Sequence, residues 1–224
     1  QGGAIMQIKW YGHSCFLLTD SNGVRILTDP FSPKTMFELP AIEADAVTVS
    51  HDHDDHNYIS AVVGSTKLIR TADEFEVGGV KIKGFMTYHD TMKGTLRGTN
   101  IMFRFEMDGM KVLHCGDLGE HLDDEVIEKI GKIDILLVPI GAIYTIDDLE
   151  ARDLANRLHA RVVIPMHYRN PKLSFELCPL EPFVEAVRHC EVYKMGECLI
   201  NIMPESLGKD RVIIPRPFNP AVDE

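Results

Sequence analysis

The sequence predicts an α/β fold in which two β-sheets pack against each other and helices cover the outside. Short runs rich in β-branched and aromatic residues dominate the first half of the 224-residue chain, and strand-like and helix-like runs alternate in the second half. Neither an internal repeat nor a long linker interrupts this pattern. We therefore expect one domain over residues 1–224, with residues 1–5 as an expression remnant or a disordered tail.

The expected strands are short and lie mostly in the first half of the chain. They cover residues 7–11, 14–19, 24–28, 46–50, 67–70, 80–85, 100–105 and 111–115. Hairpin-turn residues occupy 20–23 and Asp108-Gly109, between neighbouring runs. Two further apolar runs, 133–138 and 161–165, predict buried strands in the second half.

Helical spacing of apolar residues predicts three helices. Residues 124–130 form the first, and residues 147–159 have the clearest apolar stripe. Acidic residues in the first turn of the second helix suit the positive end of its dipole. The third helix covers 182–189, and Pro182 is well suited to a first helical turn.

Composition limits the partners of the chain. A formal net charge of -11 opposes the approach of phosphate backbones, so nucleic acid is not an expected partner, although bound divalent cations would reverse the potential locally. A membrane is not expected either, because no run is long and apolar enough to cross a bilayer. Five scattered cysteines without C-x-x-C spacing indicate free thiols in a reducing cytoplasm. We expect a small-molecule substrate and leave a homo-oligomer open.

The run HDHDDH at residues 51–56 carries the strongest chemical signal. It follows an apolar run, so it lies where a strand ends and a loop begins. Residues two apart face the same way in an extended chain, so His51, His53 and Asp55 can converge, while His56 turns off as the chain leaves the strand. Imidazole and carboxylate together suit zinc, manganese or iron. A solvated acidic turn is the weaker interpretation of so unusual a composition.

Other candidate ligands come directly after predicted strands, where loops build sites on a rigid scaffold. These are His89, Asp117 and His167. Each is weak without the cluster, because a lone histidine or aspartate there is usually structural or solvated, and His114 competes with His89. Asp29 is either a carboxylate that orients a ligating histidine or part of a plain turn.

Several further residues have two interpretations each. His13 can line the pocket or satisfy polar groups in the core, and we favour the core. Tyr168, Arg169 and Arg97 can bind an anionic substrate, but a solvated surface is the default for each arginine. Surface or helix positions are expected for His121, His159 and His189.

Residues 51–56 match the H-x-H-x-D-H signature of the metallo-β-lactamase superfamily, and the chain resembles that family over most of its length. Segments similar to its motifs are WYGHS at 10–14, TDP at 28–30, YHD at 88–90, HCGD at 114–117, VPIGA at 138–142 and IPMHY at 164–168. The fifth segment is similar to the small metal-dependent hydrolase branch, which includes ascorbate-phosphate-lactonase-like proteins.

The resemblance implies an α/β fold that is a four-layer αββα sandwich of two mixed β-sheets flanked by helices. It also implies two divalent metal ions, zinc first, with manganese or iron as alternatives. One ion would be held by His51, His53 and His89, the other by Asp55, His56 and His167, and Asp117 would bridge them. The resemblance favours His89 over His114, because Gly116-Asp117 matches the family motif and His114 then only flanks it.

The implied activity is hydrolysis of an ester, lactone, amide or phosphoester bond in a small metabolite by a hydroxide that bridges the metals. Asp55 is the expected catalytic residue, because it would both ligate metal and orient the hydroxide. One alternative is a non-catalytic metal-binding module, although a purely structural zinc site closes with four ligands. A phosphodiesterase or nuclease-like activity is another, and the acidic balance of the chain counts against it.

Overall fold

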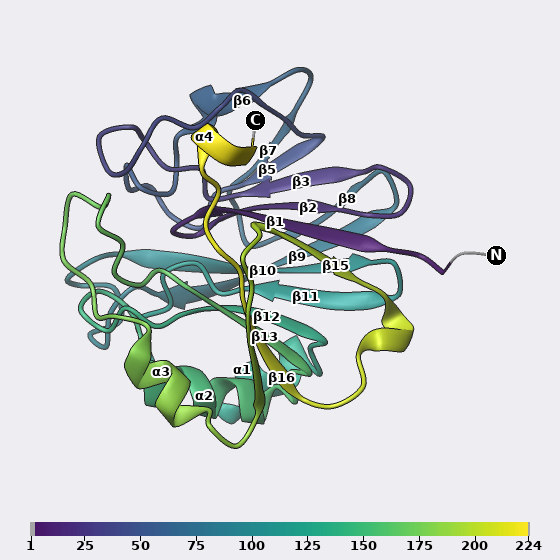
Figure 1. Cartoon of the computed structure of the whole chain (residues 1–224). Coiled ribbons are helices and arrows are strands. Elements are labelled where there is room, and N and C mark those ends of the chain that lie inside the picture. The colour runs from purple at the N-terminus through teal and green to yellow at the C-terminus, as the bar shows by residue number, and fades with distance from the viewer. Residues whose placement is uncertain (1–2, 224) are drawn as a thin grey trace.

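The computed structural model describes residues 3–223, and two stacked mixed β-sheets form most of it (Figure 1). The first sheet contains, in spatial order, β15 (Leu199–Ile202), β1 (Met6–Gly12), β2 (Cys15–Thr19), β3 (Arg25–Thr28), β5 (Ala46–Thr48) and β7 (Lys67–Ile69). Strands β15, β1, β2 and β3 pair antiparallel, whereas β3, β5 and β7 pair parallel.

The second sheet is larger. It contains β14 (Glu191–Lys194), β16 (Arg211–Ile214), β13 (Val162–Met166), β12 (Ile135–Pro139), β11 (Met110–His114), β10 (Thr99–Met107), β9 (Val80–Tyr88) and β8 (Glu74–Val77). Pairing is parallel from β14 to β11 and antiparallel from β11 to β8. A separate short pair joins β4 (Ile42–Glu43) to β6 (Val62–Val63).

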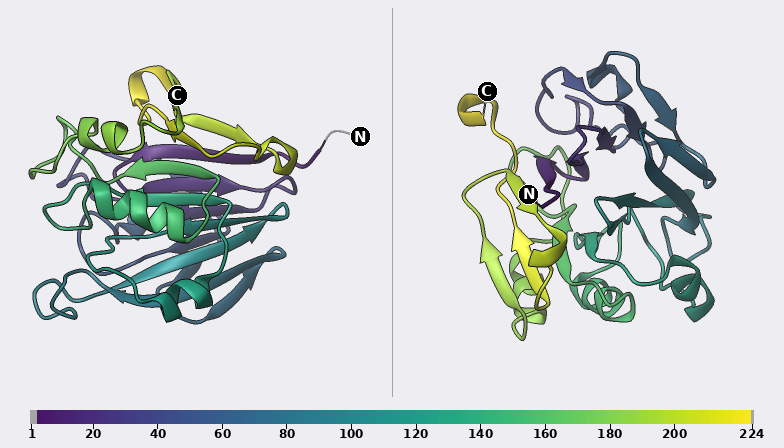
Figure 2. Two further views of the ribbon diagram at one scale, coloured as in Figure 1. Left: turned by 90° about the horizontal axis from the view of Figure 1, so that it is seen from below. Right: turned by 90° about the vertical axis from the view of Figure 1, so that its right-hand side faces the viewer.

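Three helices cover the outer face of the second sheet (Figure 1; Figure 2, view from below). They are α1 (Asp124–Ile130), α2 (Asp148–Arg157) and α3 (Glu181–Ala186). Helix α2 begins with a capping box, because Asp147 accepts a hydrogen bond from the Glu150 backbone and Glu150 accepts one from the Asp147 backbone, both at 2.9 Å. A cap of this kind contributes about 1 kcal/mol. The three predicted helices are thus present, with ends that differ by three residues at most.

The outer layer of the first sheet is mostly irregular chain. Residues 31–44 and 58–62, which include the short helix η1 (Ile59–Ala61), cover this face, and α4 (Pro220–Asp223) lies on the same side of the molecule (Figure 1). Prolines at 30, 33 and 40 remove backbone donors and disfavour helix in the preceding residues. The αββα sandwich is therefore confirmed, with one outer layer built largely without long helices.

Alternation along the strands produces two hydrophobic layers. Ile8 and Phe16 of the first sheet share one buried cluster with Phe103, Leu113 and Leu136 of the second. The opposite face of the first sheet presents Tyr11, Leu27 and Val47 to a second cluster with Phe31, Leu39 and Phe218. The inter-sheet cluster contains side chains from Met6 to Ile214, which supports our proposal of a single domain.

Some strands were not expected from the sequence. These are β4, β6, β8, β14, β15 and β16, all four residues long or shorter. So short a run shows little periodicity, and β15 pairs with β1 across almost the whole chain, as Met6 opposite Ile202. Of the expected N-terminal tail, residues 1 and 2 lie outside the described residues, and 3–5 have no regular structure. Within residues 3–223, no helix has the length and apolarity needed to cross a membrane.

Candidate metal centre

The predicted ligands follow strands of both sheets and converge at one end of them. His51 lies three residues after β5, and Asp117 lies three residues after β11. His89 directly follows β9, which extends to Tyr88, beyond the expected 80–85, and His167 directly follows β13. Strand ends of the two stacked sheets thus supply the site, as expected for polar side chains carried on loops of a rigid scaffold.

Asp117 is the centre of this arrangement. The Nε2 atoms of four histidines surround its Oδ2 atom, at 3.0 Å (His167), 3.2 Å (His56), 3.2 Å (His89) and 3.7 Å (His51). Two donor atoms about 2.1 Å from one tetrahedral metal ion stand about 3.4 Å apart. The spacing of the donors therefore fits atoms that share metal ions with the carboxylate.

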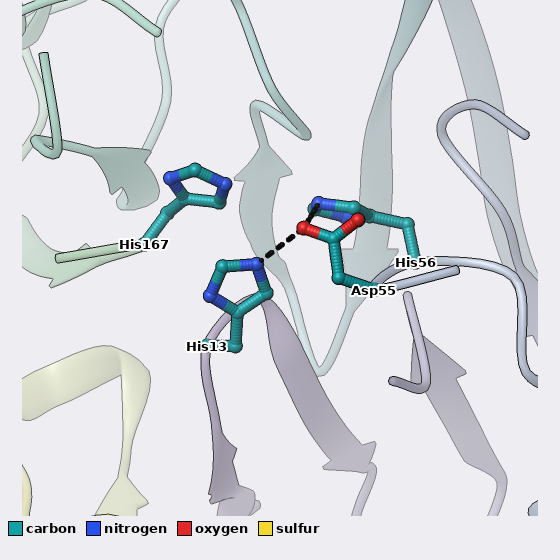
Figure 3. Close-up of side chains that lie close together, drawn as sticks. All are labelled: His13, Asp55, His56 and His167. Atoms are coloured by element: carbon teal, nitrogen blue, oxygen red, sulfur yellow. Dashed lines mark hydrogen bonds and ion pairs between the residues drawn. The ribbon is translucent and has the colours of Figure 1, made fainter. Parts of the chain in front are cut away.

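Within residues 3–223, three groups of side chains have donor atoms that lie within 4.8 Å of one another. One of them consists of Asp29, His51 and His56, and the other two contain the predicted ligands. The three-histidine group is His51, His53 and His89. The Asp55 group is His13, Asp55, His56 and His167, whose side chains face one another in Figure 3. These groups contain the two predicted ligand sets and add His13 to the second.

His13 lies in the site, whereas the core was the favoured interpretation of the sequence. Its Nε2 atom is 2.8 Å from Oδ2 of Asp55, and its ring centroid is 4.2 Å from that of His167. It follows β1 directly, with a left-handed backbone (φ 52°). That position after a strand, which it shares with His89 and His167, is the signal in the sequence that could have identified it.

Asp29 and Ser50 orient two of the histidines. Asp29 Oδ2 lies 2.8 Å from Nδ1 of His56 and accepts a 2.5 Å hydrogen bond from the Ser50 hydroxyl, which itself lies 2.9 Å from Nδ1 of His51. Because the hydroxyl gives its proton to Asp29, it can only accept from His51. Both rings then carry a proton on Nδ1 and direct Nε2 toward the site, as in other metal centres. This geometry agrees with the orienting role expected for Asp29, whereas no motif in the sequence pointed to Ser50.

His114 does not join either group. Its Nε2 atom lies 2.8 Å from the Ser14 carbonyl oxygen, and its Nδ1 atom accepts from the Gly116 backbone at 3.1 Å. Both ring nitrogens are therefore engaged with backbone in the core. Of the two histidines left open by the sequence, the structure brings His89 to the site.

Gly116 allows the Asp117 loop to approach its neighbours closely. It has a φ of 55°, and a Cβ atom there would lie 2.3 Å from Oδ1 of Asn100 and 2.6 Å from Cβ of Ser50. Asn100 is fully buried and accepts from the Asp117 backbone at 2.9 Å, while it donates at 2.9 Å to both Thr87 and the Cys115 carbonyl. These contacts fix the carboxylate of Asp117 against the histidines.

Burial and neighbouring charges set the ionisation of the site. Burial, followed by the His167 imidazole, lowers the pKa of His13 to about 4, and burial with His56 holds the pKa of His51 well below its usual range. Burial alone would raise the pKa of Asp117, but His167 and His56 keep it well below its usual range. Neutral imidazoles and an ionised carboxylate are the forms that bind metal.

The pKa of His56 moves in the opposite direction. Burial would lower it, but the carboxylates of Asp117 and Asp55 raise it well above its usual range. The pKa of Asp55, which burial would raise, is in turn held low by His56 and by the hydrogen bond from His13. The two carboxylates thus retain a positive charge between them, which a divalent cation could supply instead.

A cavity of about 370 Å³ opens onto these groups. It is lined by His53, Asp55, His89, Arg97, Asp117, Tyr144, His167 and Phe175. Of the residues considered for anion binding, only Arg97 lines it, because Tyr168 packs against Trp10 at 5.7 Å and Arg169 lies 3.5 Å from Glu176. Tyr144 and Phe175 belong to loops without a recognisable motif.

Comparison with known proteins identifies the family of the chain. A family model described as beta-lactamase superfamily domain matches residues 7–167. A UPF0173 protein of Pyrococcus furiosus is 32% identical over 73% of this chain and 83% of its own, and a UPF0173 metal-dependent hydrolase of Methanoculleus marisnigri is 33% identical over 91% and 100%. The solved structure of a proposed Zn-dependent hydrolase of the metallo-beta-lactamase superfamily from Thermotoga maritima has a TM-score of 0.78 and 39% identity, over 94% of this chain and 98% of its own. The chain therefore belongs to the metallo-β-lactamase superfamily and, within it, to the UPF0173 family.

Proposed function

We propose that the chain is a metal-dependent hydrolase with two divalent ions, zinc first and manganese or iron as alternatives. The contact of one Asp117 oxygen with four histidine Nε2 atoms carries this proposal. Among residues 3–223, nothing forms a hydrogen bond with Nε2 of His51 or Oδ1 of Asp117, although both atoms are buried. Buried polar atoms without partners are rare, so this donor set fits metal ions.

The ligands follow from the two groups. His51, His53 and His89 would hold one ion, Asp55, His56 and His167 would hold the other, and Asp117 would bridge the two. Three side-chain ligands and a shared carboxylate leave room for water at each ion, as catalytic sites require. The relative from Methanoculleus marisnigri, described as a metal-dependent hydrolase, supports the same class of activity.

The metal ions and the residues around them would have different roles in hydrolysis. The bound ions would lower the pKa of a water molecule between them and stabilise negative charge that develops in the transition state. Asp55 lines the cavity with a side chain that is 15% exposed, so its carboxylate can ligate and also accept a hydrogen bond that orients the attacking water. Asp29 and Ser50 hold the rings of His56 and His51 in position throughout.

The proposed substrate is a small metabolite with an ester, lactone, amide or phosphoester bond. A cavity of about 370 Å³ is within the usual range for small-molecule sites. We further propose a cytoplasmic protein, since all five cysteines are free thiols. A partner such as nucleic acid is not proposed for a chain of net charge -11.

The test is a panel of chromogenic esters, lactones, amides and phosphodiesters, assayed on protein reconstituted with zinc, manganese or iron. Hydrolysis that disappears on chelation and returns with metal is the expected result. If the protein takes up no metal, the proposal is wrong. If it takes up metal but cleaves no bond of any class, a non-catalytic metal-binding module replaces the hydrolase.

A further inference from the structure

One cationic side chain, that of Arg97, lines the cavity. Arg97 is the only lysine or arginine among the lining residues in the described part of the chain, and its guanidinium carbon lies 5.3 Å from the centre of the Tyr144 ring. It is half-buried and forms no ion pair with a carboxylate of residues 3–223. Most other arginines do form such pairs, namely Arg25, Arg70, Arg104, Arg157, Arg169, Arg188 and Arg216.

The loop that carries Arg97 is built around one buried carboxylate. Asp90 is 3% exposed, and its Oδ1 atom accepts hydrogen bonds from the backbones of Met92 (2.8 Å) and Gly94 (2.9 Å). Its Oδ2 atom accepts from the backbones of Leu96 (3.0 Å) and Arg97 itself (2.8 Å). Four charge-assisted bonds to one side chain fix the backbone from which the guanidinium extends.

Aromatic rings connect Arg97 with the metal centre. Tyr144 lies under the guanidinium and packs edge-on against Phe175, with ring centroids 5.8 Å apart. Phe175 in turn packs edge-on against His13 at 5.8 Å, and His13 contacts Asp55 at 2.8 Å. The lining of the cavity therefore combines a cation, two aromatic rings and a metal-binding cluster.

We propose that Arg97 binds a carboxylate or phosphate group of the substrate, so that the enzyme acts on a small molecule that carries an anionic group in addition to the cleaved bond. The inference rests on the proposed function, which assigns the reacting bond to the metal cluster. A guanidinium presents a planar set of donors that matches either anion, and stacking on Tyr144 leaves its edge free to donate. Bound divalent ions would add to the positive potential of the cavity.

Alternative roles for Arg97 fit the contacts less well. A purely structural arginine of this chain would pair with a carboxylate or a carbonyl, as Arg157 does with Asp124 and with the Leu122 carbonyl, each at 2.7 Å. A solvated surface arginine would not need a loop organised by Asp90 or a position on the cavity wall. In a chain of net charge -11, an unpaired cation beside the site also attracts anions selectively.

The test compares ligands that differ only at the end remote from the metals. Calorimetry on zinc-loaded protein measures Kd for the dicarboxylates succinate, glutarate and adipate and for the monocarboxylates of equal length, butyrate, valerate and hexanoate. One carboxylate of each ligand engages the metal cluster, so the ratio of the two Kd values reports on the second end. For at least one chain length we expect the dicarboxylate to bind about tenfold more tightly, as one charge-assisted hydrogen-bond pair allows.

Variants assign this preference to Arg97. Arg97→Gln should reduce the ratio of Kd values to about one. Arg97→Lys should keep part of the preference for the dicarboxylate, since lysine retains the positive charge but lacks the planar set of donors of a guanidinium. The matched control is Lys9→Gln, which removes the same charge from an aromatic stack outside the cavity, where the Lys9 amine lies 5.2 Å from the Tyr11 ring centre. The control should leave the ratio unchanged.

Two further variants test the support of Arg97. Tyr144→Leu should lower the ratio of Kd values, because it removes the ring beneath the guanidinium. Tyr144→Phe, which keeps the ring, should leave the ratio close to that of the wild type. Asp90→Asn should also lower the ratio, because an amide cannot accept all four backbone hydrogen bonds. A merely structural role for Asp90 would lower the melting temperature or weaken all ligands equally without changing the ratio, and that result would contradict its positioning role.

The outcomes separate the inference from the function on which it rests. Replacing succinate by 3-phosphonopropanoate, in the wild type and in Arg97→Gln, decides between carboxylate and phosphate, because only the part of either affinity that Arg97→Gln removes belongs to the guanidinium. Equal affinity for charged and uncharged ends at every length, or a preference that survives Arg97→Gln, overturns it. Failure of the proposed function would be visible separately as no turnover by zinc-loaded protein, because the ratio of Kd values does not depend on catalysis. Absence of zinc uptake would overturn both.

Discussion

The Nε2 atom of His13 lies 2.8 Å from the Oδ2 atom of Asp55, which connects a loop of the first sheet to the HDHDDH run. Burial and His167 lower the pKa of His13 to about 4, so near neutral pH the ring is neutral. Since Nδ1 of His13 forms no hydrogen bond within residues 3–223, Nε2 carries the proton and donates it to Asp55. His13 therefore fixes the orientation of a proposed metal ligand.

Removing this contact should weaken catalysis without unfolding the protein. We expect His13→Ala to lower kcat/KM or metal affinity by about 10–100-fold, the usual effect of losing a group that orients a metal ligand. His13→Gln can still donate to Asp55 and should recover part of the loss. Steady-state kinetics and zinc titration measure both variants. Equal activity of His13→Ala and wild type would show that His56 alone orients Asp55.

Metal content tests the bridging role of Asp117. Fully loaded protein should contain close to two equivalents of metal, and Asp117→Ala should lower that number, because one carboxylate contacts both groups of ligands. Asp52→Ala is the matched control, since Asp52 belongs to the same HDHDDH run but is exposed and lies 3.5 Å from Arg70. Elemental analysis after gel filtration gives the stoichiometry. Two equivalents retained by Asp117→Ala would contradict a shared ligand.

Removal of metal should lower the stability of the fold. Asp29, Asp55 and Asp117 lie in one buried region, and without cations their charges are compensated only by histidines. Metal that binds the native state raises the melting temperature by mass action, so chelation should lower it and zinc should restore it. Differential scanning calorimetry follows both changes. A melting temperature that does not respond to chelation would be incompatible with a well-occupied native site.

His114 provides a prediction about pH. Burial lowers its pKa below the ordinary 6.5, and its ring stays engaged with backbone in the folded protein. As the pH falls below about 6.5, the unfolded chain gains a proton at His114 that the native state does not, so the free energy of unfolding decreases, by up to about 1.4 kcal/mol per pH unit. His114→Gln should remove this part of the slope.

The comparison for His114 is made by urea unfolding at several pH values between 5 and 8, on chelated protein so that metal binding does not contribute. The two proteins should have similar slopes above about pH 7, where His114 is neutral in both states. Below that pH the wild type should lose stability faster than His114→Gln. Identical slopes over the whole range would mean that His114 titrates alike in the folded and unfolded chain.

Local sequence patterns predicted those parts of the molecule whose conformation is set locally. The acidic first turn and apolar stripe of α2 identified the helix to within two residues at its end, and the β-rich runs identified the central strands of both sheets. The sequence did not predict strand β15, because its four residues are stabilised by pairing with β1 at the other end of the chain. Pairing between strands that are far apart in the sequence cannot be read from the pattern of a few neighbouring residues.

The same distinction applies to the site. The HDHDDH run and the strand-end positions of Asp117 and His167 are visible in the sequence, and the structure brings these residues together. Ser50, Tyr144 and Phe175 have no distinguishing neighbours, so only the folded chain reveals their contacts with Asp29, Arg97 and His13. A residue that orients another is recognised by its contacts, and only the tertiary structure shows those contacts.

The last prediction separates catalysis from binding at Asp55. Its side chain lines the cavity, is 15% exposed and lies 2.8 Å from His13 and 3.1 Å from His56, so it is the carboxylate best placed to orient an attacking water. Asp55→Asn preserves size and one oxygen acceptor but removes the charge. We expect kcat to fall by at least ~100-fold, the scale of losing a positioned catalytic group, while the protein remains folded. His159→Ala, at an exposed position after α2, should change kcat little. Metal content must be measured on each variant, because loss of an ion would also lower kcat. If Asp55→Asn keeps near wild-type kcat with two equivalents of metal, Asp55 is only a ligand, and another group must orient the water.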